Sequence, residues 1–318
     1  MIVSFVVIGK NEGWRLEKCF KSLYSFVETE GIKEFEVVYV DSRSSDDSIS
    51  QSLSYKNKTI VIEGECNAAI ARNIGAKESS GDILFFIDGD MELLPGFWSS
   101  VVKDGKLIYP FVSGMENDVL HDNDWSYKET KVRRTYMKDK EQYEITTGGL
   151  FIIDRALWVM VGGMDNRQKK CQDLDFGFWL YRYGHKLLRK PDIWVNHYTQ
   201  YYAVRSGFNV DLAKYQSLLT RKHILSFTVE KFMLHYNYSF WLLCACLLLM
   251  IGTMSLCPIA IYLSAATYRA FKTYSRTKSE MGYLSLLKDR VFEDAYFLFY
   301  FATFWPKQPE VKYKIIEQ

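Results

Sequence analysis

Asp88-Gly89-Asp90 has the residue types and the spacing of a metal-binding turn. Two carboxylates on either side of a glycine can hold a hard divalent cation, and the glycine lets a bulky ligand approach the backbone. A cation held there would bridge diphosphate oxygens and neutralise charge on a leaving group. The alternative is a polar turn after a buried strand, with no chemistry of its own.

The elements before this turn alternate regularly along the chain. Short β-branched or apolar runs predict strands at Ile2–Ile8, Phe35–Val40, Thr59–Ile62 and Ile83–Ile87. Amphipathic spacing and polar caps predict helices at Leu16–Val27, Ser48–Leu53 and Ala68–Lys77. Strands that alternate with helices in this way indicate βαβ units and a mostly parallel sheet with helices on both faces.

Ligands bind such sheets at the carboxyl ends of the strands. Asp41 follows the second predicted strand, and Asp88 and Asp90 follow the fourth, so we expect these carboxylates on one rim. Residues 1–200 carry a net charge of −4 and residues 201–318 a net charge of +6. The acidic part is therefore where metal-binding carboxylates are expected.

Two further motifs follow a less regular region. Thr147-Gly148-Gly149 precedes a strand predicted at Leu150–Ile153. Gln172-Asp173-Leu174-Asp175 opens an aromatic helix predicted at Phe176–Tyr183. The glycine pair can be an ordinary tight turn, and both aspartates can simply cap the helix.

The composition is that of a folded chain that needs no disulfides. In 318 residues, 48% are apolar, which is enough for a sizeable core. The six cysteines form no CxxC pair and no zinc-finger spacing, which fits a reduced, cytosol-facing protein. The net charge of +2 argues against a dedicated nucleic-acid binder, so no nucleic-acid partner is expected.

A long uncharged segment predicts attachment to a membrane. Phe232–Tyr268 holds 37 residues without Asp, Glu, Lys or Arg, and a bilayer crossing needs only about 20 apolar residues. Basic residues flank the apolar stretch Ser239–Ala266 on both sides, so a single crossing and a re-entrant pair of helices bent at Pro258 both remain open. A buried hairpin in a soluble protein is the third alternative. The run Tyr296–Trp305 suits an interfacial helix.

Five sequence blocks occur in an order and at spacings that resemble a known enzyme family. They are SFVVIGKNEGWRL, EVVYVDSRSSDDS, AAIARNIGAKESSGDILFFIDGDMEL, GGLFIIDRALWVMVGGMD and QDLDFGFWLYRYG. Together they cover roughly residues 3–200 and resemble family 2 glycosyltransferases, the inverting nucleotide-sugar enzymes with the Rossmann-like GT-A fold. The start GKNEG resembles a membrane-associated branch that makes bacterial surface polysaccharides.

This resemblance implies roles for individual residues. The positions that match the donor-binding residues of the family are Ile8, Gly9, Glu12, Asp41, Arg72, Asn73 and Asp88. Asp41 would accept a hydrogen bond from the uracil N3–H, with a loop-capping role as the alternative. Gly148 and Gly149 would line the acceptor end of the site. Asp90, together with Asp88 and His197, would hold Mn²⁺ or Mg²⁺, although a lone histidine is more often a packed or surface residue.

The resemblance also implies a general base. Asp173 matches the aspartate of the family's Glu-Asp pair, which takes the proton from the acceptor hydroxyl. Gln172 stands where the family has a glutamate, so Asp175 remains an alternative base. The aromatic residues of the helix, Trp179 and Tyr183, could border the acceptor sugar or pack in the core. Two cations, Lys10 and Arg205, could contact the diphosphate.

The sequence therefore predicts a GT-A catalytic domain over residues 1–230, a transmembrane or re-entrant segment over 231–268 and a basic, aromatic tail over 269–318. The expected activity is inverting transfer from a nucleotide-diphosphate sugar, with a UDP-sugar favoured, to a lipid-linked saccharide. MIVSFVVIG lacks the features of a signal peptide, so we expect the catalytic domain on the cytoplasmic side of the inner or cell membrane. A sugar nucleotidyltransferase and a non-catalytic membrane scaffold are the alternatives.

Overall fold

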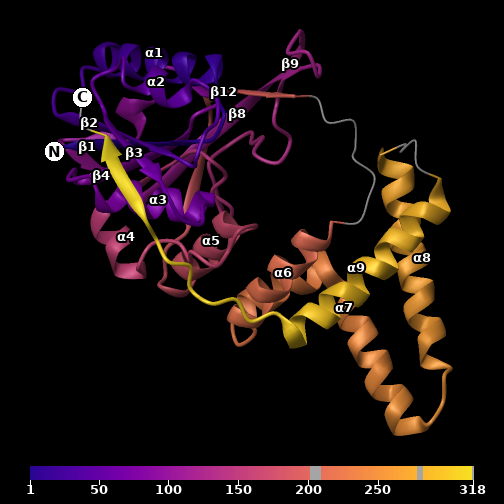
Figure 1. The fold of residues 1–318 in the computed structure, drawn as a ribbon. Helices are drawn as coiled ribbons and strands as arrows, with labels where there is room; N and C mark the ends of the chain where they lie inside the picture. Colours follow the sequence, from indigo (N-terminus) through magenta and orange to yellow (C-terminus); the bar gives the residue numbers. More distant parts are fainter. Residues whose placement is uncertain (201–208, 278–281, 317–318) are drawn as a thin grey trace. The chain divides into compact units, whose positions relative to one another are not determined.

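The computed structural model describes residues 1–200, 209–277 and 282–316 (Figure 1). The chain divides into two compact units, one of Met1–Tyr201 with Gln308–Gln318 and one of Tyr202–Lys307. The boundaries expected at residues 230 and 268 do not coincide with this division. The helix before residue 230 packs on the last helix of the second unit, and the end of the tail pairs with the sheet of the first.

The first unit contains an 11-stranded sheet with a parallel centre. Its central strands are β1 (Val3–Gly9), β2 (Phe35–Asp41), β3 (Lys58–Ile62) and β4 (Ile83–Asp88), in the order β3-β2-β1-β4. The connecting helices are α1 (Trp14–Thr29), α2 (Ser48–Ser52) and α3 (Ala68–Lys77). Every strand and helix expected in this region is confirmed, because the β-branched runs are buried on both faces of the sheet and the helices each bury one side.

Beyond β4 the sheet is mixed, which corrects the expectation of a mostly parallel sheet. β11 (Phe151–Asp154) is antiparallel to β4, while β8 (Phe111–His121) is parallel to β12 (Leu187–Gln200). The short antiparallel strands are β5 (Met91–Leu93), β9 (Tyr127–Val132), β10 (Gln142–Glu144) and β13 (Tyr313–Ile316). A separate hairpin joins β6 (Val102–Lys103) to β7 (Lys106–Leu107) after a 3-10 turn at Trp98–Ser100. The region 104–143 lacked a sequence pattern because β8 is almost wholly buried and β9 almost wholly exposed.

Two apolar layers lie on the two faces of this sheet. α1 and α2 cover one face, where Phe5, Phe20 and Phe85 are fully buried. α3, α4 (Arg155–Val161) and α5 (Gln172–Arg182) cover the other, around Phe86 and Phe176 (Figure 1). The helices thereby leave the carboxyl ends of the parallel strands as the rim on which a site can form.

The second unit consists of α6 (Val210–His223), α7 (Phe227–Thr253), α8 (Pro258–Thr277) and α9 (Tyr283–Thr303). Of the two arrangements left open for Ser239–Ala266, the structure forms a pair of helices that separate before Pro258 and no single continuous helix. Met254 has a left-handed φ of 51°, and Pro258 begins a new helix because proline suits the first helical position but cannot continue a helix. In the part of the chain that the structure describes, no helix has both the length and the apolar character to cross a membrane.

Candidate functional site

Parallel pairing brings the ends of β1, β2 and β4 together. Gly9 is in register with Asp41, and Ile8 is in register with Asp88. The expectation that carboxylates after the second and fourth strands share one rim is therefore confirmed. The physical reason is that parallel neighbours in consecutive register must end at the same edge.

A cavity of about 620 Å³ opens at this rim. Nine of the predicted site residues line it: Ile8, Gly9, Glu12, Arg72, Asp88, Asp90, Gly148, Gly149 and Asp173. Lys10 also lines it, together with Lys169 and Lys170 from the loop before α5. The structure thus combines segments that lie more than 150 residues apart in the sequence into one acidic cavity with cationic side chains at its edge.

Asp88 is held between Arg72 and Gly149. Arg72 Nη2 donates a 2.7 Å hydrogen bond to Asp88 Oδ1, and the arginine side chain is 2% exposed. Burial raises the pKa of Asp88, although the Arg72 charge opposes this. A Cβ at Gly149 would collide with Asp88 Oδ2. Glycine is therefore required here for the loop to approach the carboxylate.

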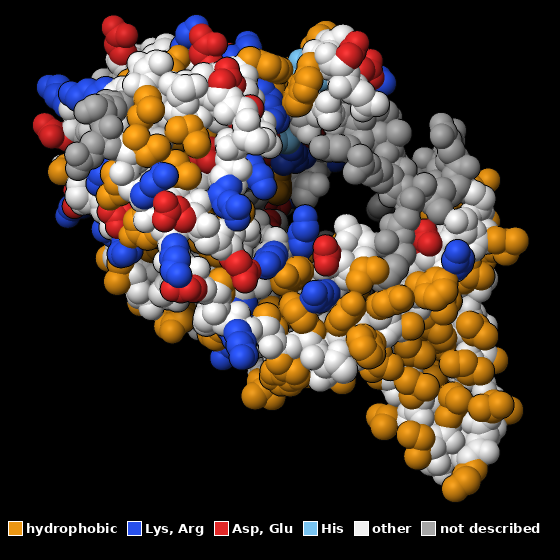
Figure 2. All heavy atoms as spheres, viewed as in Figure 1, with side chains coloured by type: hydrophobic (Ala, Val, Ile, Leu, Met, Phe, Trp, Pro, Cys, Tyr) orange, Lys and Arg blue, Asp and Glu red, His pale blue; other side chains and the backbone are white. Residues whose placement is uncertain are grey.

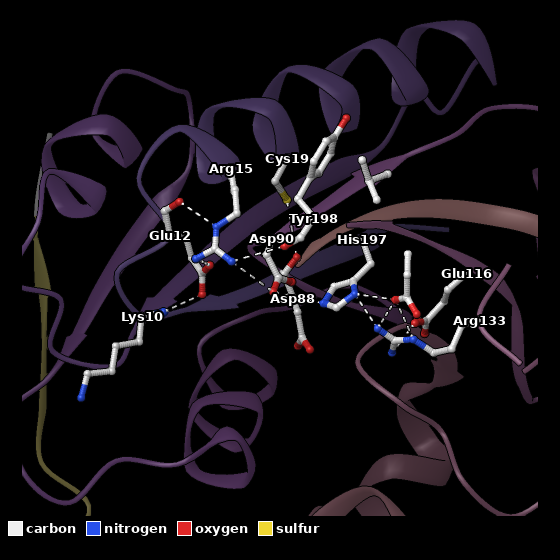
Figure 3. A network of polar contacts seen from close by, with 12 residues as sticks. Lys10, Glu12, Arg15, Cys19, Asp88, Asp90, Glu116, Arg133, His197 and Tyr198 are labelled. Carbon is white, nitrogen blue, oxygen red and sulfur yellow. Dashed lines mark hydrogen bonds and ion pairs between the residues drawn. The ribbon is translucent and has the colours of Figure 1, made fainter. Parts of the chain in front are cut away.

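Asp90 faces His197, the histidine that the resemblance grouped with it (Figure 3). Its Oδ2 lies 3.3 Å from His197 Nε2 and 3.6 Å from Arg15 Nη1. The antiparallel pairing of β5 with β12 produces this proximity, since Met91 is in register with His197 and Tyr198 N–H donates to the Asp90 carbonyl. Burial opposes ionisation of Asp90, but His197 and Arg15 hold its pKa below the usual range.

A chain of charged side chains continues behind His197. Its Nδ1 lies 3.0 Å from Asp118 Oδ1, and Arg133 Nη2 donates a 2.6 Å hydrogen bond to the same oxygen. Arg133 Nη1 also lies 2.8 Å from Oε2 of Glu116, which is fully buried. The alternating residues 116 and 118 of β8 thus both meet Arg133 from the loop after β9.

Two members of this network, Glu12 and His197, have displaced protonation equilibria. Burial and the neighbouring Asp90 charge raise the pKa of Glu12 to about 7. Burial would lower the pKa of His197, but hydrogen bonds to Asp118 and Asp90 outweigh it and raise the pKa to about 10. Shifted pKa values cluster at functional sites, because binding and catalysis often need ionisable groups that are buried beside other charges.

α5 directs Asp173 toward the cavity and buries Asp175. Asp173 lines the cavity, whereas Asp175 is 0% exposed and does not. The N-cap of α5 is Cys171, and neither aspartate occupies that position, so the capping alternative does not describe them. Burial raises the pKa of the Cys171 thiol to about 12, so it is protonated at neutral pH and is a poor nucleophile.

Several predicted residues lie outside the cavity lining. Asp41 is fully buried and accepts hydrogen bonds from Ser44 and the Tyr39 hydroxyl, as its loop-capping alternative describes. Asn73 donates to the Met164 carbonyl and to the Asn166 side chain, and thereby holds the loop before α5.

The aromatic residues of α5 are also away from the cavity. Trp179 is half-buried and lines a different hollow, and Tyr183 at the end of the helix is 51% exposed. Arg205 lies outside the described residues. The contacts of Asp41 and Asn73 in this structure are thus structural, and the roles toward a ligand predicted for these two residues and for Trp179 and Tyr183 remain predictions.

The side-chain atoms at the Asp88-Gly89-Asp90 turn are of the types that bind a hard cation. Asp90 Oδ1 is buried and has no hydrogen-bond partner in the described part of the chain. A carboxylate oxygen is the ligand that Mn²⁺ and Mg²⁺ prefer, and an imidazole nitrogen is an accepted second type once metal binding displaces its proton. No group of three His, Cys, Asp or Glu side chains among residues 1–200, 209–277 and 282–316 is already arranged around a metal position.

Sequence reasoning missed the residues that surround His197. Arg15 carried a signal, because it lies three residues after Glu12 and Arg15 Nη2 makes a 2.7 Å ion pair with that glutamate. Asp118, Arg133 and Glu116 carried none, because only the pairing of β8 with β12 brings them to the site.

Comparison with known proteins decides the family. Residues 4–184, more than half of the chain, match the family model described as Glycosyl transferase family 2. The chain belongs to glycosyl transferase family 2. The resemblance recognised in the sequence blocks is thereby confirmed at the level of the family.

Curated relatives of this family 2 chain match it over part of their length. Glycosyltransferase AglE of Haloferax volcanii is 38% identical over 93 residues, 28% of this chain and 30% of the relative. A probable N-acetylgalactosaminyltransferase 7 of Caenorhabditis elegans is 30% identical over 139 residues, 40% of this chain and 22% of the relative. The chain thus spans less than a third of the length of these relatives.

A solved structure supports the fold. The crystal structure of GalNAc-T7 with UDP, GalNAc and Mn²⁺ has a TM-score of 0.52 and 16% identity, and the likeness covers 74% of this chain and 55% of that one. At this identity the likeness shows the fold alone. The GT-A-like α/β fold expected from the sequence is confirmed, with the mixed sheet described above.

Proposed function

We propose that this family 2 chain is an inverting glycosyltransferase that uses a nucleoside diphosphate sugar. The observation that carries the proposal is that Asp173 and the Asp88/Asp90 turn line the same cavity. Asp173 would accept the proton of the acceptor hydroxyl as this oxygen attacks the anomeric carbon from the face opposite the nucleotide.

Arg72 supports a diphosphate in the cavity. It is 2% exposed and lines the cavity, and its Nε and Nη1 have no hydrogen-bond partner among the described residues. Leaving a buried donor unpaired costs about 1–3 kcal/mol, and a phosphate oxygen would remove that cost. Ile8 and Gly9 would then border the nucleoside at the end of β1. Lys10 and Lys170 at the edge of the cavity would add positive charge near the phosphates.

Asp90 is the residue we expect to hold Mn²⁺ or Mg²⁺, with Asp88 and His197 beside it. The unpaired Oδ1 of Asp90 supports this assignment. A bound cation would neutralise charge on the departing diphosphate. His197 would keep its ring oriented toward Asp90, because Asp118 holds the opposite nitrogen.

A thermal-shift screen tests the donor site. UDP, GDP, CDP and dTDP are each added to the full chain with Mn²⁺ or with EDTA, since a ligand that binds the folded state raises the melting temperature by mass action. We expect one nucleoside diphosphate to raise it in Mn²⁺ and to lose part of that effect in EDTA. Asp90→Ala should remove the Mn²⁺-dependent part, and Asp124→Ala on an exposed turn should keep it. No shift with any nucleotide would contradict the proposal.

A second assay separates this function from the alternatives. A glycosyltransferase is expected to release nucleoside diphosphate slowly when water is the only acceptor, and faster when a saccharide acceptor takes up the sugar. A nucleotidyltransferase would instead consume a nucleoside triphosphate with a sugar phosphate. A non-catalytic scaffold would do neither.

The second unit supports attachment to a membrane surface by α7 and α8. Large apolar side chains around the junction of the two helices are exposed, namely Leu248, Leu249, Ile251, Met254 and Leu256 (Figure 2). The surrounding 37 residues carry no Asp, Glu, Lys or Arg, and α7 and α8 pack against each other. A contiguous apolar surface of this kind is typical of a membrane or protein contact. We place the catalytic unit on the cytoplasmic side of the inner or cell membrane, where a lipid-linked saccharide for surface polysaccharides would be the acceptor.

Membrane attachment is tested by changing the exposed tip. Leu248→Glu with Ile251→Glu should move the full chain from a salt-washed membrane fraction to the supernatant, because apolar anchoring is not screened by ions. Truncation near residue 222 is unsuitable, since it would remove β13 from the sheet. Tyr143→Glu, at an equally exposed position of the first unit, is the control. Wild-type chain in the supernatant would contradict the attachment.

A further inference from the structure

An aromatic group lies at the rim but outside the lining of the 620 Å³ cavity. It consists of Trp14, His121, Trp125, Tyr127 and Tyr198, and we call it the aromatic shelf. The Trp14 ring centroid lies 5.7 Å from those of His121 and Trp125 and 5.3 Å from that of Tyr198. The rings come from the start of α1, the β8–β9 connection and the end of β12.

Two rings of the shelf are exposed to solvent and two are buried beneath them. Tyr127 is 64% exposed and Trp14 is 37% exposed, whereas His121 and Tyr198 below them are 6% and 8% exposed. Aromatic rings that served only to fill a core would not leave this much surface in water. The buried pair therefore supports an outer pair that remains available to a ligand.

Trp125 has a backbone conformation that a bulky residue rarely adopts. Its φ is 65°, in the left-handed region that glycine and asparagine occupy at little cost. The turn is fixed by hydrogen bonds from Asp122 N–H to the Ser126 carbonyl and from Gln200 Nε2 to the Asn123 carbonyl. Strained backbone of this kind is concentrated at binding and active sites. A tryptophan at this position therefore indicates a use for its side chain.

Arg15 connects the shelf directly to the metal-binding turn. Its guanidinium carbon lies 4.6 Å from the Trp125 ring centroid, and its Nη1 lies 3.6 Å from Asp90 Oδ2. Tyr198 N–H also donates a 2.9 Å hydrogen bond to the Asp90 carbonyl. A molecule on the shelf would thus lie beside the reacting end of the cavity without occupying the donor position.

We propose that the aromatic shelf binds the acceptor saccharide. A sugar ring offers an apolar C–H face that packs on an aromatic ring and a rim of hydroxyls that need polar partners. Lys18 provides a donor beside the rings, and the exposed Asp122 provides acceptors. This inference rests on the proposed glycosyltransferase function, and it identifies an acceptor-binding surface distinct from Gly148 and Gly149.

Fluorine NMR of the full chain labelled with 5-fluorotryptophan tests the shelf. Trp14→Phe, Trp125→Phe and Trp305→Phe assign three of the eight tryptophan signals. The probes are lactose, maltose, cellobiose and N,N′-diacetylchitobiose. We expect at least one of them to shift the Trp14 and Trp125 signals and to leave Trp305, 69% exposed in the second unit, unchanged. No shift with any probe, or an equal shift at Trp305, would overturn the proposal.

Variants then separate binding from packing. Trp125→Ala should weaken binding of the responding sugar about tenfold or more, as loss of a well-packed aromatic contact does at other binding surfaces. Tyr143→Ala, 65% exposed on β10, should bind it as the wild type does. If Trp125→Ala lowers the melting temperature but leaves the affinity for the sugar unchanged, the shelf serves only to pack the fold and the proposal is wrong.

Two competition experiments distinguish a failure of the shelf proposal from a failure of the proposed donor site. UDP with Mn²⁺ should shift the melting temperature without displacing the sugar from the shelf. Displacement would assign the sugar to the donor cavity and overturn the proposal, even though the proposed function would stand. Shifts produced only by anionic lipid vesicles would assign the shelf to lipid and overturn it as well.

Discussion

The Asp118 carboxylate lies 3.0 Å from Nδ1 of His197, while the other ring nitrogen faces Asp90 at 3.3 Å. His197 and Asp118 are in register across β12 and β8, so the backbone itself sets this pair. A carboxylate at one ring nitrogen fixes the ring orientation and leaves the second nitrogen to the site. Asp118 is thus a positioning residue that acts on Asp90 through His197.

Removing that carboxylate should weaken cation binding. We expect Asp118→Ala to lower the affinity for Mn²⁺ by roughly 10- to 100-fold, as loss of an outer partner of a metal-bound histidine does. Isothermal titration of the full chain with Mn²⁺ measures it. Asp124→Ala, on the exposed turn between β8 and β9, is the control. Equal affinities in both variants would show that His197 needs no support from Asp118.

The two aspartates of α5 should separate in their effects. Asp173→Asn retains size but cannot take up the proton, so turnover should fall by roughly a hundredfold or more while nucleotide binding survives. Asp175→Asn changes a fully buried carboxylate and should lower the free energy of unfolding by about 1–3 kcal/mol. Turnover and melting temperature of both variants decide this. A dead Asp175→Asn enzyme beside an active Asp173→Asn enzyme would reverse the assignment.

Adding one methyl group at Gly149 should displace Asp88. The new Cβ would collide with Asp88 Oδ2, and a shift of about 1 Å at a reacting centre can reduce the rate roughly a hundredfold. Gly149→Ala should therefore lose turnover with little change in circular dichroism. Gly282→Ala, at a position with open space around it, should behave as the wild type does. Full activity of Gly149→Ala would mean that Asp88 tolerates displacement.

Glu36 should contribute stability that disappears in acid. Burial would raise its pKa, but hydrogen bonds donated by Ser80, Ser4 and Gly81 outweigh burial and hold the pKa below its ordinary value of 4.5. The folded state therefore binds fewer protons than the unfolded state, so the contribution is complete at neutral pH. It is lost as the pH falls below the ordinary value and through the lowered one.

We expect Glu36→Gln to lower the free energy of unfolding by about 1–2 kcal/mol at pH 7. The difference from the wild type should close as the pH falls below about 4. Urea titrations at several pH values measure it, with the exposed Glu34→Gln as the control. A difference that does not depend on pH would show that the ionised form of Glu36 has no special role.

The sequence by itself determined the first half of the catalytic fold and the residues at its rim. Regular alternation of strands and helices located β1 to β4, and the position of Asp41, Asp88 and Asp90 after strand ends predicted their common edge. These conclusions needed only local periodicity and the rule that parallel strands end together. The motif blocks added Asp173 and the glycine pair, and the structure brings these residues to the same cavity as Asp88 and Asp90.

Only the tertiary structure decided what surrounds Asp90 and how the second half of the sheet is arranged. The contacts of His197 with Asp90 and Asp118, and of Arg133 with Glu116, depend on strand pairings across many residues. A shift of one residue in such a pairing would turn each side chain to the other face. The packing of the whole sheet sets the register, so it cannot be predicted from composition or from local spacing. For the same reason the pairing of β13 with β3 emerges only when the chain is folded.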